Sequence, residues 1–249
     1  MGADIDPPVY FGGTMFNGKR VSIVIAAAGS GKRMRTGDRN KVYIELQGKT
    51  ILERAFDVFE SNEKVDRIIV AVKMDELEFC RKEVLPKEKH DKLMDVIPGG
   101  SERCHSVYNA LVRLDEEDIV LIHDGARPFV DNEIIDKCIE AVYEHGSCAA
   151  GVPVKDTIKI VKDGLAVNTP DRRELFAMHT PQGFFAGDIK KYIKCGIDEG
   201  YLGTDEASFA EKQGKKVFIV ESKYDNIKVT TSEDLIIAEA ILMKRRNKE

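Results

Sequence analysis

The 249-residue sequence has no tryptophan, few cysteines and no apolar run near the roughly 20 residues that a membrane-spanning helix requires. Its five cysteines are odd in number, widely scattered and without C-x-x-C spacing, which argues against a disulfide framework and against a zinc site. The N-terminus shows no basic-then-apolar pattern of the kind that signal peptides carry. We therefore expect a cytoplasmic protein with reduced thiols and no membrane partner.

A strong charge of either sign is also lacking, since 38 basic residues nearly balance 43 acidic ones and the net charge is −5. No general affinity for nucleic acid is expected, so any anion site must be local. The length fits one large α/β domain or two small ones. Residues 1–20 contain paired prolines and paired glycines without a sustained period, so we expect them to form an N-terminal extension. Residues 21–249 are then expected to form a single domain.

Apolar, strand-like runs alternate with segments of helical period over the first 150 residues, which is typical of parallel βαβ units. We predict an α/β fold, with a Rossmann-like, mostly parallel sheet flanked by helices, in which ligands bind beyond the carboxyl ends of the strands. The predicted strands are Val21–Ala26, Arg67–Val72, Asp95–Ile97, Ile119–His123, Cys148–Val152 and Lys216–Val220, and the predicted helices are Ile51–Glu60, Glu76–Glu83, Arg103–Leu114, Glu133–Glu144 and Asp234–Lys244.

This alternation stops at residues 154–178, where Thr157–Val161 and Leu165–Val167 flank an Asp-Gly turn. An Asp-Gly pair between β-prone runs is a strong hairpin signal. Because an isolated two-stranded ribbon is only marginally stable in water, this arm is expected to pack on a second copy of the chain. The sequence therefore predicts a protruding β-hairpin arm that is used in a homodimer.

The first predicted strand runs into a turn of small residues, Ala26 to Gly31, which lets backbone N–H groups approach an anion closely. Lys32, Arg33 and Lys41 then bring positive charge to the same place. The spacing fits neither a P-loop nor a dinucleotide fingerprint. The turn is interpreted as a cradle for a nucleotide phosphate chain, and the alternative is an ordinary loop with solvated basic residues.

Asp124 directly follows another apolar run, so its carboxylate should be fixed at a strand end, where Mg²⁺ is the natural partner. A turn or helix-capping role is the alternative. His123 is expected to pack or to hydrogen-bond in the core. Arg127 precedes a proline, which restricts its backbone and favours a bidentate grip on a phosphate.

Two further segments allow both a functional and a capping interpretation. Gly99 and Gly100 could admit a flat base, while Ser101 could cap the following helix; Thr204 fits a helix N-cap best. Thr157 and Arg172, on and just beyond the predicted arm, could reach a neighbouring site across a dimer contact.

In their order along the chain, these motifs are similar to those of the 2-C-methyl-D-erythritol 4-phosphate cytidylyltransferase family, which serves the non-mevalonate route to isoprenoid precursors. The resemblance covers roughly Ser22 to Ala240. Two positions depart from the family pattern, because Asn40 stands where proline is usual and Gly125 where alanine is common. The segments that carry the resemblance are residues 27–34, 40–43, 99–103, 123–128, 154–157, 180–182, 204–208 and 226–230.

The resemblance implies that a phosphate oxygen of the acceptor attacks the α-phosphorus of CTP and that pyrophosphate leaves, with Mg²⁺ or another divalent cation held near Asp124. It also assigns roles by position. The implied catalytic residues are Arg33, Lys41, Arg172 and Lys228; the implied nucleotide-binding residues are Ala27, Ala28, Gly29, Gly31, Gly99, Gly100, Ser101, Ser106, Asp124 and Gly125; and the implied acceptor-binding residues are Arg127, Thr157, Thr180 and Thr204.

An acceptor phosphate is already ionised near neutral pH, so this reaction needs no strong general base. The sequence agrees, since it shows no Ser-His-Asp or paired-carboxylate arrangement. Two alternatives stay open. One is a cytidylyltransferase that acts on another polyol phosphate, such as ribitol 5-phosphate, and the other is a catalytically silent nucleotide-binding or assembly protein.

Overall fold

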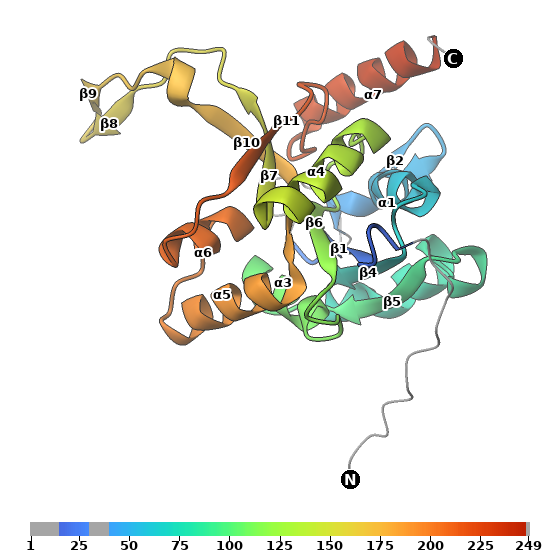
Figure 1. Ribbon diagram of the computed structural model, residues 1–249. Helices are drawn as coiled ribbons and strands as arrows, with labels where there is room; N and C mark the ends of the chain where they lie inside the picture. Colours follow the sequence, from blue (N-terminus) through green and yellow to red (C-terminus); the bar gives the residue numbers. More distant parts are fainter. Residues whose placement is uncertain (1–14, 30–39, 248–249) are drawn as a thin grey trace.

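The computed structural model describes residues 15–29 and 40–247, and its centre is a seven-stranded sheet (Figure 1). The strands of this sheet are β1 (Val21–Ala26), β4 (Arg67–Val72), β5 (Leu93–Pro98), β6 (Ile119–Asp124), β7 (Ser147–Pro153), β10 (Phe176–Phe185) and β11 (Phe218–Glu221). Their order across the sheet is β11-β7-β10-β6-β1-β4-β5, and every pairing is parallel except the two that β10 makes. The predicted mostly parallel α/β sheet is confirmed.

Helices cover both faces of this sheet (Figure 1). The α-helices are α1 (Ile51–Ser61), α2 (Leu77–Phe79), α3 (Arg103–Leu111), α4 (Asn132–His145), α5 (Ala186–Asp198), α6 (Glu206–Lys212) and α7 (Ser232–Arg246). Short 3-10 turns occupy Lys41–Tyr43 (η1), Met74–Glu76 (η2), Lys87–Lys89 (η4) and Arg172–Glu174 (η5), and a π-turn occupies Cys80–Val84 (η3). None of the helices in the described ranges combines the length and the apolar character that crossing a bilayer demands.

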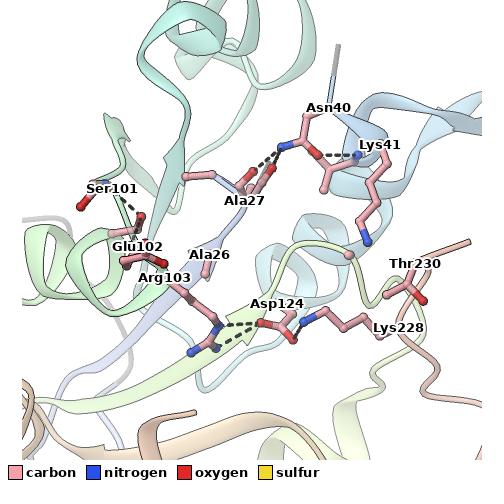
Figure 2. Close-up of a pocket in the computed structure, with 16 residues that line it drawn as sticks. Ala26, Ala27, Asn40, Lys41, Ser101, Glu102, Arg103, Asp124, Lys228 and Thr230 are labelled. Carbon is pink, nitrogen blue, oxygen red and sulfur yellow. Dashed lines mark hydrogen bonds and ion pairs between the residues drawn. The ribbon is translucent and has the colours of Figure 1, made fainter. Parts of the chain in front are cut away.

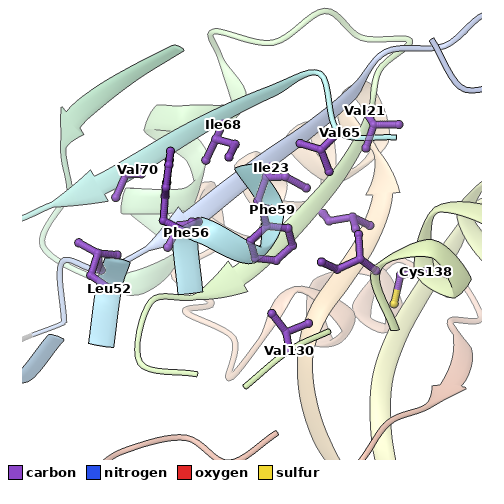
Figure 3. Packing of buried hydrophobic residues seen from close by; sticks show 14 of the residues in the cluster. Val21, Ile23, Leu52, Phe56, Phe59, Val65, Ile68, Val70, Val130 and Cys138 are labelled. Carbon is purple, nitrogen blue, oxygen red and sulfur yellow. The ribbon is translucent and has the colours of Figure 1, made fainter. Parts of the chain in front are cut away.

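Strand β1 shows why the sheet is buried on both sides. Ile23 and Ile25 point to one face, where they pack in a cluster with residues of α1 and α4 that include Phe56 and Phe59 (Figure 3). Val24 points to the other face and packs in the cluster beneath α3, α5 and α6. All of these side chains are fully buried. Fixing β1 from both faces makes its carboxyl end a rigid platform for the turn that follows.

The structure departs from the sequence prediction at two places. The predicted helix Glu76–Glu83 was wrong as a regular helix, because the chain there passes from η2 through one short α-turn to the π-turn η3. The sequence did not predict β10, whose antiparallel course between β6 and β7 closes the middle of the sheet. Within residues 1–20, which were expected to form an extension, Phe16 packs against the core cluster around α1 and α4.

The predicted hairpin is present as β8 (Ile160–Lys162) paired antiparallel with β9 (Leu165–Asn168). Its turn residues Asp163 and Gly164 have φ angles of 49° and 79°, the left-handed conformation that this turn chemistry supplies. The hairpin projects from the body (Figure 1), and both strands are exposed along their whole length. A second small pair joins β2 (Glu45–Leu46) to β3 (Lys49–Thr50) beside α1.

Candidate functional site

The carboxyl ends of β1, β5 and β6 open onto a pocket of about 520 Å³ (Figure 2). It collects many of the predicted nucleotide-binding residues together with both predicted catalytic lysines. The lining residues are Ala26, Ala27, Ala28, Gly29, Asn40, Lys41, Val42, Gly100, Ser101, Glu102, Arg103, Ser106, Asp124, Ala126, Lys228 and Thr230.

Close packing explains the small residues on one wall of this pocket. A Cβ at Gly99 would lie 2.4 Å from the Cβ of Ala28, so the two strand ends approach only because both residues are small. A Cβ at Gly100 would lie 2.4 Å from that of His105. The Gly100 N–H donates to Ser106 Oγ at 3.0 Å, and that hydroxyl donates to the Glu102 carbonyl at 3.1 Å. Helix α3 thereby holds the glycine segment where a flat ring could lie against its backbone.

The opposite wall carries a cluster of charges around Asp124 (Figure 2). Its Oδ2 lies 2.8 Å from Lys228 Nζ, and its Oδ1 accepts hydrogen bonds from the Arg103 guanidinium at 3.1 Å. Arg103 also pairs at 2.5 Å with Glu206, which is fully buried at the start of α6. Burial alone would raise the pKa of Asp124, but Arg103, Lys228 and Arg127 outweigh it and hold the pKa far below its usual range. Asp124 is therefore an ionised carboxylate in the lining of the pocket.

Behind this cluster, His123 links the strand end to its neighbours. Its Nε2 lies 2.9 Å from the Arg127 carbonyl, so this nitrogen carries the proton, and its Nδ1 accepts from the Thr180 hydroxyl at 3.0 Å. Thr180 Oγ1 in turn accepts the Asp124 N–H at 3.1 Å. Burial lowers the pKa of His123 to about 4, which keeps the ring neutral. The prediction that His123 is a core residue is confirmed.

A second pocket of about 300 Å³ adjoins the first, and the two share Arg103, Asp124 and Lys228. Three of the four predicted acceptor-binding residues line it. Arg127 is fixed there by hydrogen bonds from its guanidinium to the carbonyls of Asn226, at 2.8 Å, and Met178, at 3.3 Å. The lining residues are Arg103, Asp124, Arg127, Met178, His179, Thr180, Gln182, Thr204, Asp205 and Lys228.

Other predicted site residues lie away from these pockets. Thr157 and Arg172 are exposed at the base of the arm, where Arg172 Nη1 donates to the Lys155 carbonyl at 3.1 Å. Gly125 lies beneath the pocket, where a Cβ would come within 3.0 Å of Ala27 Cβ. Gly31 and Arg33 fall outside the described residues.

Both capping interpretations were wrong. Helix α6 is capped by Asp205, whose Oδ1 accepts the Ser208 N–H at 3.0 Å, while Thr204 lies one residue earlier. Helix α3 follows Glu102, which makes no capping bond, and the Ser101 hydroxyl instead bonds His105 Nδ1 at 2.9 Å. Ser101 and Thr204 thus keep their hydroxyls near the two pockets.

Sequence reasoning gave no role to Arg103 or Glu206, although their ion pair supports the whole charge cluster. The signal was limited to charged residues in two motifs, Gly99–Arg103 and Thr204–Ser208, and the paired residues are 103 positions apart in the sequence. Nothing local in either motif indicates that they meet.

The side chains of the pocket suit one kind of magnesium site, in which the substrate supplies most of the ligands. Among residues 15–29 and 40–247, no group of three or more His, Cys, Asp or Glu side chains could hold a metal by itself. Asp124 offers a single ionised carboxylate beside the space for a nucleotide, which is how Mg²⁺ is usually held in nucleotide sites, through one or two carboxylates and substrate phosphates.

Comparison with known proteins gives one consistent result. The family model described as 2-C-methyl-D-erythritol 4-phosphate cytidylyltransferase matches residues 21–244. A protein of that name from Alkaliphilus metalliredigens is 44% identical over 232 residues, which are 92% of this chain and 96% of the relative. One from Clostridium kluyveri is 47% identical over 219 residues, 88% of this chain and 94% of the relative. The crystal structure of 4-diphosphocytidyl-2C-methyl-D-erythritol synthase from Anaerococcus prevotii superposes with a TM-score of 0.80 at 34% identity, covering 91% of this chain and 97% of that one.

Proposed function

The chain belongs to the 2-C-methyl-D-erythritol 4-phosphate cytidylyltransferase family, and we propose that it transfers CMP from CTP to 2-C-methyl-D-erythritol 4-phosphate with release of pyrophosphate. The observation that carries the proposal is the placement of Lys41, Lys228 and Arg103 around two adjoining pockets. One pocket has the glycine walls suited to a nucleotide, and the other has the fixed arginine suited to a sugar phosphate.

The reaction joins two anions, so its barrier lies in repulsion and alignment. A phosphate oxygen of the acceptor forms a bond to the α-phosphorus, and the bond from that phosphorus to the bridging oxygen of the leaving pyrophosphate breaks. Lys41 and Lys228 both line the larger pocket, and Lys228 also lines the second one. Fixed positive charge there stabilises the charge that builds in the transition state. Arg127, held by two carbonyls, orients the acceptor phosphate. Arg33, outside the described residues, is assigned to the α-phosphate by the family motif alone.

Mg²⁺ is part of the proposal. Asp124 would hold the ion together with oxygens of the triphosphate, and the ion would supply further positive charge to the phosphates. Arg103 and Lys228 hold the pKa of Asp124 far below its usual range, so the carboxylate is ionised, and the metal ion would share its oxygens with these two cations. The five cysteines are all free, which supports a reducing, cytoplasmic location.

The arm supports a homodimer. Ile160, Val161, Leu165 and Val167 are 43%, 57%, 70% and 54% exposed, an apolar surface that one chain leaves uncovered. A second copy of this chain is the proposed occupant. Thr157 and Arg172 at the base of the same arm are then placed to act in the site of the partner rather than in their own.

The test is an assay of pyrophosphate release from CTP in the presence of Mg²⁺, with methylerythritol phosphate, with ribitol 5-phosphate and with no acceptor. The proposal expects release with methylerythritol phosphate at least about a hundredfold faster than with the other two. Equal release with ribitol 5-phosphate, or none with either acceptor, would contradict it.

A further inference from the structure

Asn40 immediately precedes Lys41, and its side chain bonds the segment Ala27–Gly29, which follows β1 (Figure 2). Its Nδ2 donates to the Ala27 carbonyl at 3.0 Å and to the Gly29 carbonyl at 2.6 Å. Its Oδ1 accepts the Val42 N–H at 3.4 Å, where η1 begins. One side chain that is only 4% exposed therefore connects the end of β1 to the start of the segment that carries Lys41.

The backbone of Asn40 is held from a third direction. Its N–H donates to Glu76 Oε1 at 2.9 Å, and Glu76 is only 6% exposed at the end of η2, in the segment that follows β4. Lys73 Nζ lies 3.8 Å from the same oxygen, and the other carboxylate oxygen has no partner. A buried carboxylate is costly unless it is paired, so Glu76 has a structural reason to hold this N–H.

These contacts matter because Ala27, Gly29, Asn40 and Lys41 all line the larger pocket. Carbonyl oxygens carry partial negative charge and would repel a phosphate, and the Asn40 amide engages two of them. In a planar trans peptide the Ala28 N–H points opposite to the Ala27 carbonyl, so this bond also sets the direction of that donor. The amide thus orients peptide groups of the turn as well as the neighbouring lysine.

The same contacts explain how this segment is held in place although Asn40 stands where the family usually has proline. Asn40 has φ −64° and ψ 142°, angles that a proline adopts without strain. Proline would stiffen the chain through its ring, but it has neither the side-chain amide nor the N–H that Asn40 uses. In this chain, hydrogen bonds to Ala27, Gly29 and Glu76 supply the rigidity.

We propose that Asn40, anchored by Glu76, is a positioning residue. It fixes Lys41 and the segment Ala27–Gly29 in the arrangement needed when the acceptor attacks the α-phosphate of CTP. The inference rests on the proposed function for its chemistry. It predicts that disturbing Asn40 lowers turnover without removing any group that touches the substrate.

The first test compares Asn40→Ala and Asn40→Asp with wild type in kcat and in KM for CTP. Misplacement by about 1 Å can cost a hundredfold in rate, so Asn40→Ala should lower kcat by about 10- to 100-fold with a smaller change in KM. Asn40→Asp keeps the shape but turns an oxygen toward two carbonyls, so it should lower kcat further. It should also abolish the rise in melting temperature that CTP gives wild type.

Asn62→Ala is the matched control. Asn62 is equally buried, at 4% exposed, its amide bonds Asn132 and Asp136 of α4, and none of the three residues lines either pocket. It should lower the melting temperature while leaving kcat, measured well below that temperature, within about twofold of wild type. The inference is overturned if Asn40→Ala behaves like Asn62→Ala.

The second test uses proline. Glu76→Met leaves the Asn40 N–H unpaired and should lower kcat about tenfold in the wild-type background. In an Asn40→Pro background there is no N–H to lose, so the same change should cost less than about twofold. Equal losses in both backgrounds would show that Glu76 does not act through Asn40.

The two proposals fail in different ways. Wild type that gains melting temperature with CTP but releases no pyrophosphate with methylerythritol phosphate contradicts the proposed function. A CTP-induced shift that survives in Asn40→Asp contradicts the positioning role, whatever the acceptor proves to be.

Discussion

The charge cluster at the strand ends and the arm differ in how far their side chains are buried and paired within a single chain. In the cluster, Asp124 and Glu206 are 7% and 0% exposed, and each has cationic partners within the same chain. In the arm, Leu165 is 70% exposed and its neighbours are also uncovered. The cluster is thus organised before any ligand arrives, whereas the arm has a packing surface without an occupant. We propose that the body holds the nucleotide pocket and its lysines, and that the arm supplies assembly and brings Thr157 and Arg172 to the site of the partner.

Lys41→Ala tests the organised side of this comparison most strongly. Loss of one preorganised charge-stabilising group usually costs about 10²- to 10³-fold in kcat, so turnover should fall by that amount while CTP binding changes less. Lys49→Ala removes an exposed lysine that pairs with Asp57 at the surface, and it should leave kcat unchanged. Steady-state kinetics of both variants decide the matter, and a Lys41→Ala enzyme within a few fold of wild type would remove this residue from catalysis.

Glu206→Ala tests whether the cluster also stabilises the fold. Removing one partner of a buried ion pair lowers the free energy of unfolding by about 3–5 kcal/mol. The lower end is expected here because Arg103 keeps its ion pair with Asp124. Glu116→Ala breaks a surface pair with Lys190, in which the glutamate side chain is 77% exposed, and should cost under about 1 kcal/mol. Urea unfolding measures both, and equal losses would show that burial of the cluster contributes nothing.

Leu165→Asp tests the arm. Burial of a leucine contributes about 1.5–3 kcal/mol, so this change should raise the dimer dissociation constant at least about tenfold. Val112→Asp is the control, since Val112 is 52% exposed at the end of α3, and Figure 1 shows α3 apart from β8 and β9. Analytical ultracentrifugation across a range of concentrations should show dissociation only for Leu165→Asp. A wild-type monomer at every concentration would contradict the assembly role.

The smallest predicted effect concerns pH. Burial lowers the pKa of His123 from 6.5 to about 4, so as the pH falls the unfolded chain binds a proton before the folded one does. Stability is present above pH 6.5 and is lost toward pH 4, and this residue should account for about 2 kcal/mol between pH 7 and pH 5. Urea unfolding at several pH values measures the slope. His123→Gln keeps a donor for the Arg127 carbonyl and should flatten it, and an unchanged slope would exclude His123 as the cause.

The fold was predictable wherever one segment carries its own pattern. The apolar run of β1 and the Asp-Gly turn of the arm each indicate their structure locally, and both predictions are confirmed. Strand β10 was not predictable in this way, because Pro181 lies within it and proline normally argues against a central strand. Its position depends on packing between β6 and β7, which no local pattern records.

The site shows the same division. Lys41, Asp124 and Lys228 stand in motifs that indicate phosphate chemistry, and the structure places them around one pocket. Arg103 and Glu206 lie far apart in the sequence and meet only when α3 and α6 reach the same edge of the sheet. Such a pairing depends on the tertiary fold, so a single sequence does not reveal it.

We propose that Lys41 and Lys228, which line the same pocket, act on the same transferring phosphate. The most direct test is a cycle of Lys41→Ala, Lys228→Ala and the double variant, with kcat measured for each. The effects of groups that act as a unit are strongly non-additive. The kcat of the double variant should therefore be little lower than that of the less active single variant. Losses that multiply across the cycle would contradict the claim, because they would show two cations that contribute independently of each other.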